Sequence, residues 1–194
     1  ELKAEIAEFG DVRLATVLVG DDPASQIYIR LKHKAAEEVG IQAVDKRLPQ
    51  DTSEEEVVEL LEELNEDESV DGILVQTPLP EQIDEARVMR TLDPMKDVDG
   101  LHPFNAGQLF FGHETLVAAT PIGVMRLLAE YKIPVAGARA VVVGRSLIVG
   151  RPLSMLLLHA NATVTICHSR TTDLPRHTLD ADILVAAVGS LGLI

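Results

Sequence analysis

A tyrosine and a lysine with acid–base potential stand at a helical spacing near the start of the chain. Tyr28 and Lys32 are four residues apart, so both side chains lie on one face of the helix expected there. A partly desolvated ammonium loses its proton more easily than a solvated one, which makes Lys32 a candidate acid–base group. The simpler interpretation is a solvated pair on a helix surface. Lys34 lies off this face, and we expect it to be the solvated lysine.

Further polar groups follow an expected strand of the same region. Gln76 ends the apolar run at 71–76, and Asp97 and Asp99 lie in a KDVDG segment whose final Gly100 indicates a turn that aims a carboxylate. Ligands of parallel α/β sheets bind at the carboxyl ends of the strands. We therefore expect Gln76 and an aspartate to lie near Tyr28 and Lys32, where a carboxamide and a carboxylate would assist proton transfer.

A glycine-bounded turn in the second half of the chain is suited to binding phosphate. The β-branched run 140–143 predicts a buried strand, Gly144 ends it, and Gly150 precedes the Pro152 that favours the first turn of a helix. Backbone N–H groups and the positive end of a helix dipole would then face the ligand. Ser146 replaces the middle glycine of the usual G-x-G-x-x-G pattern, so an ordinary turn that binds nothing remains the alternative.

The end of the following strand indicates which dinucleotide is bound. NAD-binding folds usually place a carboxylate there to accept hydrogen bonds from the ribose, whereas the strand at 162–167 is followed by Ser169 and Arg170. Together with Arg145 in the turn, these residues offer a hydroxyl and two guanidinium groups, which match phosphate oxygens. The sequence thus predicts NADP as the cofactor, bound through its 2′-phosphate. Asp173 is close enough in sequence to act as a ribose acceptor, which keeps NAD open.

Strand and helix signals alternate along the chain and predict an α/β protein of two domains. The N-terminal domain, 1–120, would hold a mainly parallel sheet, and the C-terminal domain, 121–194, would be Rossmann-like and incomplete. Ser25 is a candidate N-cap for the first long helix and Gly40 a candidate stop. Three strands would leave a sheet edge uncovered, so we expect the natural chain to continue past Ile194. The expected strands are 12–20, 43–48, 71–76, 140–143, 162–167 and 182–188, and the expected helices are 25–39, 52–64 and 121–132.

Composition limits the class of protein further. The chain has 194 residues, enough for one large domain or two small ones, and a formal net charge of −14. That charge argues against broad binding to nucleic acid or to anionic membranes. No apolar run reaches membrane-spanning length, and the one cysteine, Cys167, is expected to be a buried thiol. We expect a cytoplasmic protein without a metal site, a nucleic-acid partner or a membrane partner.

Six stretches in this order resemble the bifunctional methylenetetrahydrofolate dehydrogenase/cyclohydrolase family. Together they extend through almost the whole chain and are far more specific than any one of them. They are VGDDPASQIYIRLKHKA (19–35), DGILVQTPLP (71–80), KDVDGLHPFNAG (96–107), TPIGVM (120–125), VVVGRSLIVGRP (141–152) and ATVTICHSRT (162–171).

The resemblance implies a homodimeric NADP-dependent enzyme of one-carbon metabolism that oxidises methylenetetrahydrofolate and hydrolyses the methenyl product to formyltetrahydrofolate. It implies a catalytic role for Lys32, with Tyr28 on the substrate, Gln76 holding the lysine and Asp99 at the pterin. It also places Arg145 and Ser169 at the 2′-phosphate; the turn residues Gly144, Ser146 and Gly150 and the nearby Arg170 complete the predicted cofactor site.

The sequence departs from the family pattern at three points, and two other functions stay open beside the one that the resemblance implies. Thr77 stands where the family commonly has Leu, Ala119 stands where many members have Cys, and the family's last third has no counterpart here. One alternative is a dehydrogenase that never opens the methenyl ring. The other is a dinucleotide-binding module that does not catalyse a reaction, although such a module would have no use for the four expected catalytic residues together.

Overall fold

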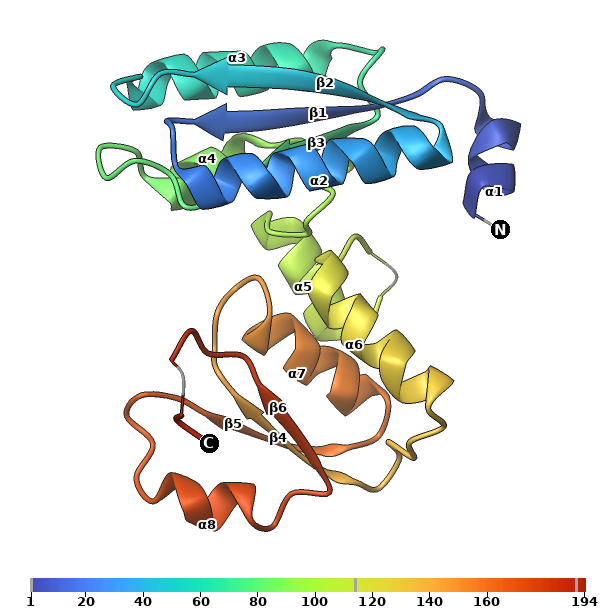
Figure 1. The fold of residues 1–194 in the computed structure, drawn as a ribbon, viewed down its shortest axis with the longest axis vertical. Coiled ribbons are helices and arrows are strands. Elements are labelled where there is room, and N and C mark those ends of the chain that lie inside the picture. Colours follow the sequence, from blue (N-terminus) through green and yellow to red (C-terminus); the bar gives the residue numbers. More distant parts are fainter. Residues whose placement is uncertain (1, 114, 191) are drawn as a thin grey trace. The chain divides into compact units, whose positions relative to one another are not determined.

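A computed structural model describes residues 2–113, 115–190 and 192–194. The chain forms two compact units, Glu1–Val98 and Asp99–Ile194, each built on a three-stranded parallel sheet (Figure 1). The predicted α/β class with parallel sheets is confirmed. The division by contacts falls before the expected boundary at residue 120, and the extent of the folate-binding and NADP-binding domains stays a prediction.

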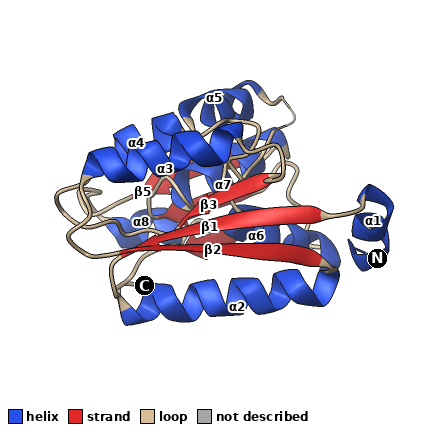
Figure 2. Ribbon diagram, turned by 90° about the horizontal axis from the view of Figure 1, so that it is seen from above, coloured by secondary structure: helices blue, strands red, loops and turns tan. Residues whose placement is uncertain are grey.

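The first unit has the apolar strand β1 in the middle of its sheet. β1 (Val12–Val19) pairs in parallel with β2 (Ile41–Leu48) on one side and β3 (Gly72–Val75) on the other. The second half of β1 and all of β3 are buried, as expected for strands covered on both faces. α2 (Pro23–Val39) covers one face of this sheet, and α3 (Glu54–Glu66) and α4 (Glu85–Thr91) cover the other (Figure 2). α1 (Leu2–Phe9) precedes β1.

The ends of α2 are fixed by side-chain and backbone caps. The Asp22 carboxylate accepts a hydrogen bond from the Ser25 backbone N–H at 2.7 Å, which lowers the pKa of Asp22, and Pro23 occupies the first turn. Ser25 was therefore wrongly expected to be the N-cap; it lies buried within the helix. The expected stop at Gly40 is confirmed, because Gly40 adopts a left-handed conformation with φ of 98°.

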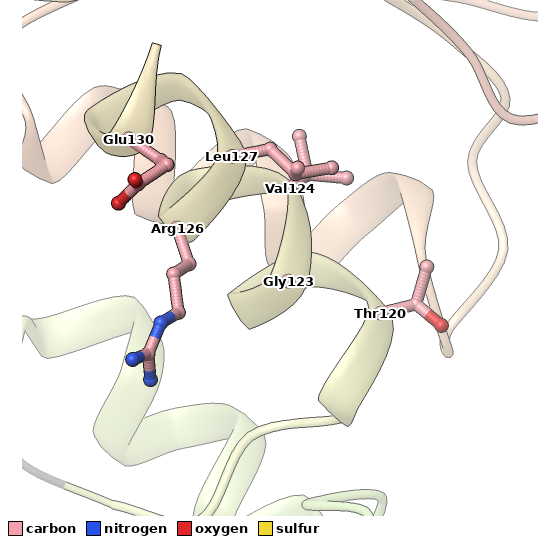
Figure 3. A pocket seen from close by; sticks show the side chains of 6 residues that line it. All are labelled: Thr120, Gly123, Val124, Arg126, Leu127 and Glu130. Carbon is pink, nitrogen blue, oxygen red and sulfur yellow. The ribbon is translucent and has the colours of Figure 1, made fainter. Parts of the chain in front are cut away.

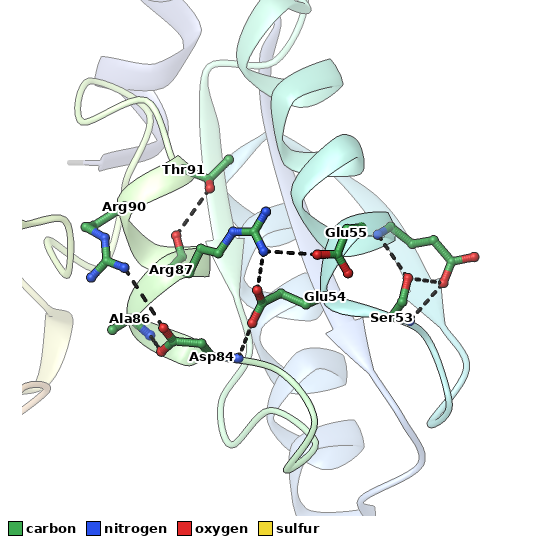
Figure 4. Close-up of polar contacts among 9 residues, drawn as sticks. Ser53, Glu54, Glu55, Asp84, Ala86, Arg87, Arg90 and Thr91 are labelled. Carbon is green, nitrogen blue, oxygen red and sulfur yellow. Dashed lines mark hydrogen bonds and ion pairs between the residues drawn. The ribbon is translucent and has the colours of Figure 1, made fainter.

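Surface charges join α3 to α4 (Figure 4). Ser53 and Glu56 form a capping box at the start of α3. Arg87 of α4 donates to the carboxylates of Glu54 and Glu55, and the hydrogen bond to Glu54 is the main cause of a raised pKa of the guanidinium. The second oxygen of Glu54 accepts the backbone N–H of Asp84 at 2.6 Å.

A lysine closes the other end of α3 and fixes the chain that leads to the expected aspartates. The Lys96 ammonium donates to the carbonyls of Leu64, Asn65 and Asp67 at 3.1, 2.8 and 2.8 Å. Cations at a helix C-terminus satisfy its unpaired carbonyls and its dipole. The Lys96 carbonyl in turn accepts the Ile73 N–H at 2.6 Å, so this segment runs beside β3.

The second unit repeats the strand arrangement of the first. β4 (Arg139–Val143) lies between β5 (Thr163–Cys167) and β6 (Ile183–Ala186), all parallel. One face packs on α6 (Ala119–Glu130) and α7 (Gly150–His159), and the other contacts the short α8 (Leu174–Thr178). α5 (Pro103–Phe111) packs on α7, where His159 Nε2 lies 2.8 Å from the Leu109 carbonyl oxygen. Cys167 is a buried free thiol as expected, and burial raises its pKa.

An ion pair joins the start of β4 to the chain entering β6. The Arg139 guanidinium donates to both carboxylate oxygens of Asp182, at 3.1 and 3.0 Å, and the Arg139 backbone N–H donates to the same carboxylate. These hydrogen bonds lower the pKa of Asp182 to about 2. Because the folded pKa is depressed, the pair stabilises the fold above the ordinary aspartate pKa and loses this effect as the pH falls toward 2.

All six expected strands are present. The helices expected at 25–39, 52–64 and 121–132 occur as α2, α3 and α6, and the helix expected after the glycine turn occurs as α7. The sequence analysis assigned no helix to α4, α5 or α8, which contain seven, nine and five residues. So few turns give too little periodicity to distinguish a helix from a loop. Among the described residues, no helix is long and apolar enough to cross a membrane.

Candidate active site and dinucleotide turn

The lysine and the carboxamide expected to cooperate are brought together in the first unit. Lys32 is a half-buried residue of α2, and Gln76 directly follows β3. Lys32 Nζ donates to Gln76 Oε1 at 3.2 Å. Gln76 is held at two other points: its backbone N–H donates to the Val17 carbonyl at 2.9 Å, and its amide Nε2 donates to the Thr77 carbonyl at 2.8 Å. Because Nε2 already donates to the Thr77 carbonyl, the oxygen of the Gln76 side-chain amide is the atom that faces the Lys32 ammonium.

Tyr28 precedes Lys32 by one helical turn and has a different environment. Its side chain is 60% exposed, and among the described residues it has no hydrogen-bond partner. An exposed ring beside a polar pair can stack on a flat ligand while its hydroxyl stays in water. Lys34 is exposed and pairs with Glu38 at 3.9 Å, which confirms that it is the solvated lysine of this helix.

The expected aspartates differ in burial. Asp97 is 1% exposed and lies opposite Ile73 of β3, whereas Asp99 is half buried and is the first residue of the second unit. Gly100 follows with φ of 63°, and a Cβ there would collide with the Leu116 carbonyl. Only glycine fits this turn without strain. The role of Asp99 at the pterin stays a prediction.

The turn after β4 has the backbone geometry of a phosphate-binding turn. Gly144 has φ of 132°, and a Cβ on Gly150 would collide with the Gly144 carbonyl, so both ends of the turn require glycine. The Ser146 hydroxyl accepts the backbone N–H groups of Val149 and Gly150 at 3.1 and 3.3 Å. Ser146 thus shapes the start of α7, where N–H groups and the helix dipole favour an anion.

The predicted phosphate ligands lie at the ends of neighbouring strands. Val143 pairs with Cys167 at the end of the β4–β5 ladder, so Arg145 and Ser169 each follow it by two residues. Parallel neighbours are about 4.8 Å apart, which places both residues at one edge of the sheet. Arg145, Ser169 and Arg170 are exposed, and among the described residues their side chains have no hydrogen-bond or ion-pair partner. A guanidinium and a hydroxyl left available beside a glycine turn fit an adenosine 2′-phosphate.

Sequence reasoning did not find the surface hollows of the second unit, two of which lie along α6 and beside the glycine turn. One, of about 620 Å³, lies along α6 (Figure 3), where Arg126 and Glu130 are its charged residues and Val124 and Leu127 its apolar ones. The other, of about 320 Å³, lies beside the glycine turn and includes Phe110, Leu147, Met155 and Ile166. The residues of the second hollow come from α5, the glycine turn, α7 and β5, so they come together only through packing and gave no local signal.

A lysine–carboxamide pair in one α/β unit and a glycine turn with free cations in the next define a two-unit, dinucleotide-dependent enzyme. Comparison with known proteins gives the family. The family model "Tetrahydrofolate dehydrogenase/cyclohydrolase, catalytic domain" matches residues 1–99, and the model for the NAD(P)-binding domain of the same family matches residues 118–194. The chain belongs to the tetrahydrofolate dehydrogenase/cyclohydrolase family, which confirms the resemblance, the fold class and a nicotinamide dinucleotide as cofactor.

Individual relatives are similar over almost the whole chain. The bifunctional protein FolD of Methanospirillum hungatei is 55% identical over 194 residues, which are 100% of this chain and 70% of the relative. FolD of Methanosarcina barkeri is 55% identical over 93% of this chain and 63% of its own length. The chain therefore spans about two thirds of the length of these relatives.

Solved structures agree with the fold. The bifunctional FolD methylenetetrahydrofolate dehydrogenase/cyclohydrolase of Campylobacter jejuni superposes with a TM-score of 0.95 at 43% identity, covering 100% of this chain and 70% of its own. The methylenetetrahydrofolate dehydrogenase–cyclohydrolase of Trypanosoma brucei, solved with NADP cofactor and an inhibitor, gives 0.94 at 36% identity, covering 100% and 68%.

The glycine turn gives a first testable prediction. Gly150→Ala places a methyl group against the Gly144 carbonyl, so we expect the second unit to lose about 2 kcal/mol of unfolding free energy or more and dinucleotide binding to be abolished. Chemical denaturation and fluorescence titration with NADPH measure both. Gly123→Ala, in the open interior of α6, is the matched control and should be neutral or slightly stabilising. If Gly150→Ala leaves the affinity for NADPH unchanged, the role of this turn in dinucleotide binding is refuted.

Proposed function

We propose that this chain forms the folate site and the glycine turn of a bifunctional enzyme that oxidises methylenetetrahydrofolate with NADP and hydrolyses the methenyl product to formyltetrahydrofolate. The observation that supports it most directly is the Lys32–Gln76 hydrogen bond in a member of this family. Relatives that carry both activities in their names support the pairing of the two reactions. We place the reaction in the cytoplasm, as expected from the sequence.

The hydrolytic step requires proton transfers that Lys32 can provide. Water adds to the methenyl carbon and loses a proton as the new C–O bond forms; the carbon–nitrogen bond then breaks, and the released nitrogen takes up a proton. Lys32, half buried and hydrogen-bonded to Gln76, would move a proton at the methenyl bridge. Tyr28 would stack on the substrate, and Asp99 would bind the pterin end through its carboxylate.

The oxidation step requires mainly that two ligands be held in contact. When bound, the dinucleotide supplies a nicotinamide that accepts a hydride from the methylene bridge. Gly144 and Gly150 let the backbone approach the pyrophosphate, and Ser146 keeps the start of α7 in place. Arg145 and Ser169 would bind the 2′-phosphate, with Arg170 beside them.

Two other functions are distinguishable from this one. A dehydrogenase without the hydrolytic step would accumulate the methenyl product. A non-catalytic module would bind NADP without reducing it in the presence of methylenetetrahydrofolate. Spectra of the reaction of the full-length protein separate these cases, because the methenyl and formyl products absorb differently.

Lys32→Met tests the catalytic assignment. We expect the cyclohydrolase rate to fall by about one-hundredfold or more, because the proton-transfer group is lost, while much of the dehydrogenase rate survives. Lys34→Met removes a solvated lysine of the same helix and should leave both rates near those of the unchanged protein. Equal loss of both activities in a folded Lys32→Met protein would contradict the assigned role.

Arg145→Ala tests the choice of cofactor. Loss of a charge-assisted contact to the 2′-phosphate should weaken NADP binding by about ten- to one-hundredfold and leave NAD binding nearly unchanged. Titration calorimetry with both dinucleotides measures the ratio, with Arg176→Ala as an exposed arginine control from the same unit. Equal weakening of NADP and NAD would exclude the 2′-phosphate contact.

A homodimer is proposed on the basis of the apolar surface of the second unit. Phe110, Leu147 and Ile166 are 65, 59 and 39% exposed around the hollow beside the glycine turn, next to the edge strand β5. Exposed apolar patches of this kind mark interaction surfaces. Phe110→Glu should convert a dimer into a monomer in analytical ultracentrifugation. Phe9→Glu is the control, because Phe9 of α1 is 83% exposed, and it should leave the mass of the particle in solution unchanged. If the unmodified protein is a monomer, the proposed dimer is refuted.

A further inference from the structure

A second hydrogen bond ties α2 to the sheet one residue after the candidate catalytic lysine. Thr16 lies on β1 and is completely buried, and its hydroxyl oxygen is 2.7 Å from His33 Nε2. The tautomer of the imidazole decides which of the two groups donates. A buried hydroxyl without a partner is costly, so the sheet requires an α2 side chain at this point.

Lys32 and His33 leave α2 in different directions. Consecutive residues of an α-helix are about 100° apart around its axis. Lys32 extends toward the end of β3, where it meets Gln76, and His33 contacts β1. On its other side His33 lines a shallow groove of polar side chains away from Gln76. The other residues of this groove are Gln26, Arg30, Lys34, Glu37 and Arg47.

Both contacts of α2 are anchored to the same strand. Thr16 is part of β1 and pairs with Leu74 of β3, and the backbone of Gln76 is hydrogen-bonded to Val17, the next residue of β1. The partners of Lys32 and His33 therefore belong to one rigid frame. Two side-chain bonds in different directions from one helical turn fix the rotation of that turn about the helix axis.

We propose that His33 is a positioning residue: through Thr16 it fixes the rotation of α2 and thereby holds the Lys32 ammonium at Gln76. The inference rests on the proposed role of Lys32 and extends it to two residues that would not touch the substrate. An α-helix with its side chains has a radius of about 5–6 Å, so a rotation of about 10° displaces a group at that radius by about 1 Å. Such a displacement exceeds the range of the 3.2 Å hydrogen bond to Gln76.

Three variants of the full-length enzyme test the proposal. Thr16→Val removes the hydroxyl at nearly constant volume, and we expect the cyclohydrolase kcat to fall by about ten- to one-hundredfold with little change in KM, because the reacting group is misplaced. Thr16→Ser keeps the hydroxyl, so its kcat should lie within about twofold of the value of the unmodified enzyme. The double variant Thr16→Val/His33→Leu replaces the polar pair by an apolar one. Its melting temperature should recover while its kcat stays low.

Chemical labelling gives a readout that does not depend on catalysis. Mass spectrometry measures how fast an amine-reactive reagent acylates Lys32 relative to Lys34 in the same molecule. This ratio should rise in Thr16→Val and in the double variant, and in Thr16→Ser it should return to the value of the unmodified enzyme. If the unmodified enzyme lacks cyclohydrolase activity, the proposed function fails while this ratio still tests the contact. An unchanged ratio in Thr16→Val, or a double variant with full kcat, would overturn the positioning role and leave Thr16 and His33 with a purely structural one.

Discussion

The parallel pairing of β1 with strands on both of its sides determines where the polar groups of the first unit can lie. A strand that is central and covered on both faces must be apolar along most of its length, and β1 is buried from Ala15 to Val19. Its polar contacts are therefore few and specific. The hydroxyl of Thr16 faces α2, and the carbonyl of Val17 accepts the backbone of Gln76. Since the strands are parallel, Gln76 emerges at the carboxyl edge of the sheet, where a helix from the adjoining crossover can bring a lysine to it.

The second unit has the same strand arrangement, but different kinds of residues follow its central strand. Its central strand is again buried, but it is followed by a turn that begins at Gly144, ends at Gly150 and is held by the Ser146 hydroxyl. Neither end of this turn tolerates a Cβ, because a Cβ on Gly144 would collide with the Ala187 carbonyl and one on Gly150 with the Gly144 carbonyl. One topology thus supports a lysine–carboxamide pair in the first unit and a glycine-bounded turn in the second. The difference arises from the residues placed just beyond the strands.

The elements with long periodic or continuous apolar patterns could be predicted from the sequence, and so could the pairing of Lys32 with Gln76. The spacing of Tyr28 and Lys32 and the position of Gln76 after a strand are local features, and parallel topology converts them into a contact. The N-cap of α2 was misplaced because Asp22 and Ser25 are both good capping residues, and backbone geometry decides between them. The Thr16–His33 contact had no local signal, since a threonine in a strand and a histidine in a helix are common. The two side chains come into contact only because α2 packs on β1.

Charge distribution explains how a protein of net charge −14 can take anionic ligands. Among the described residues, several surface cations are occupied by carboxylates: Arg47 by Asp45, Arg87 by Glu54 and Glu55, and Arg139 by Asp182. Within the part of the chain that the structure describes, Arg145 and Arg170 have no carboxylate partner, and they follow the ends of β4 and β5. At physiological ionic strength the screening length is about 8 Å, so distant carboxylates contribute little at that edge. Affinity for a phosphate there depends on which cations have been left without a carboxylate, and the overall charge of the chain has little influence on it.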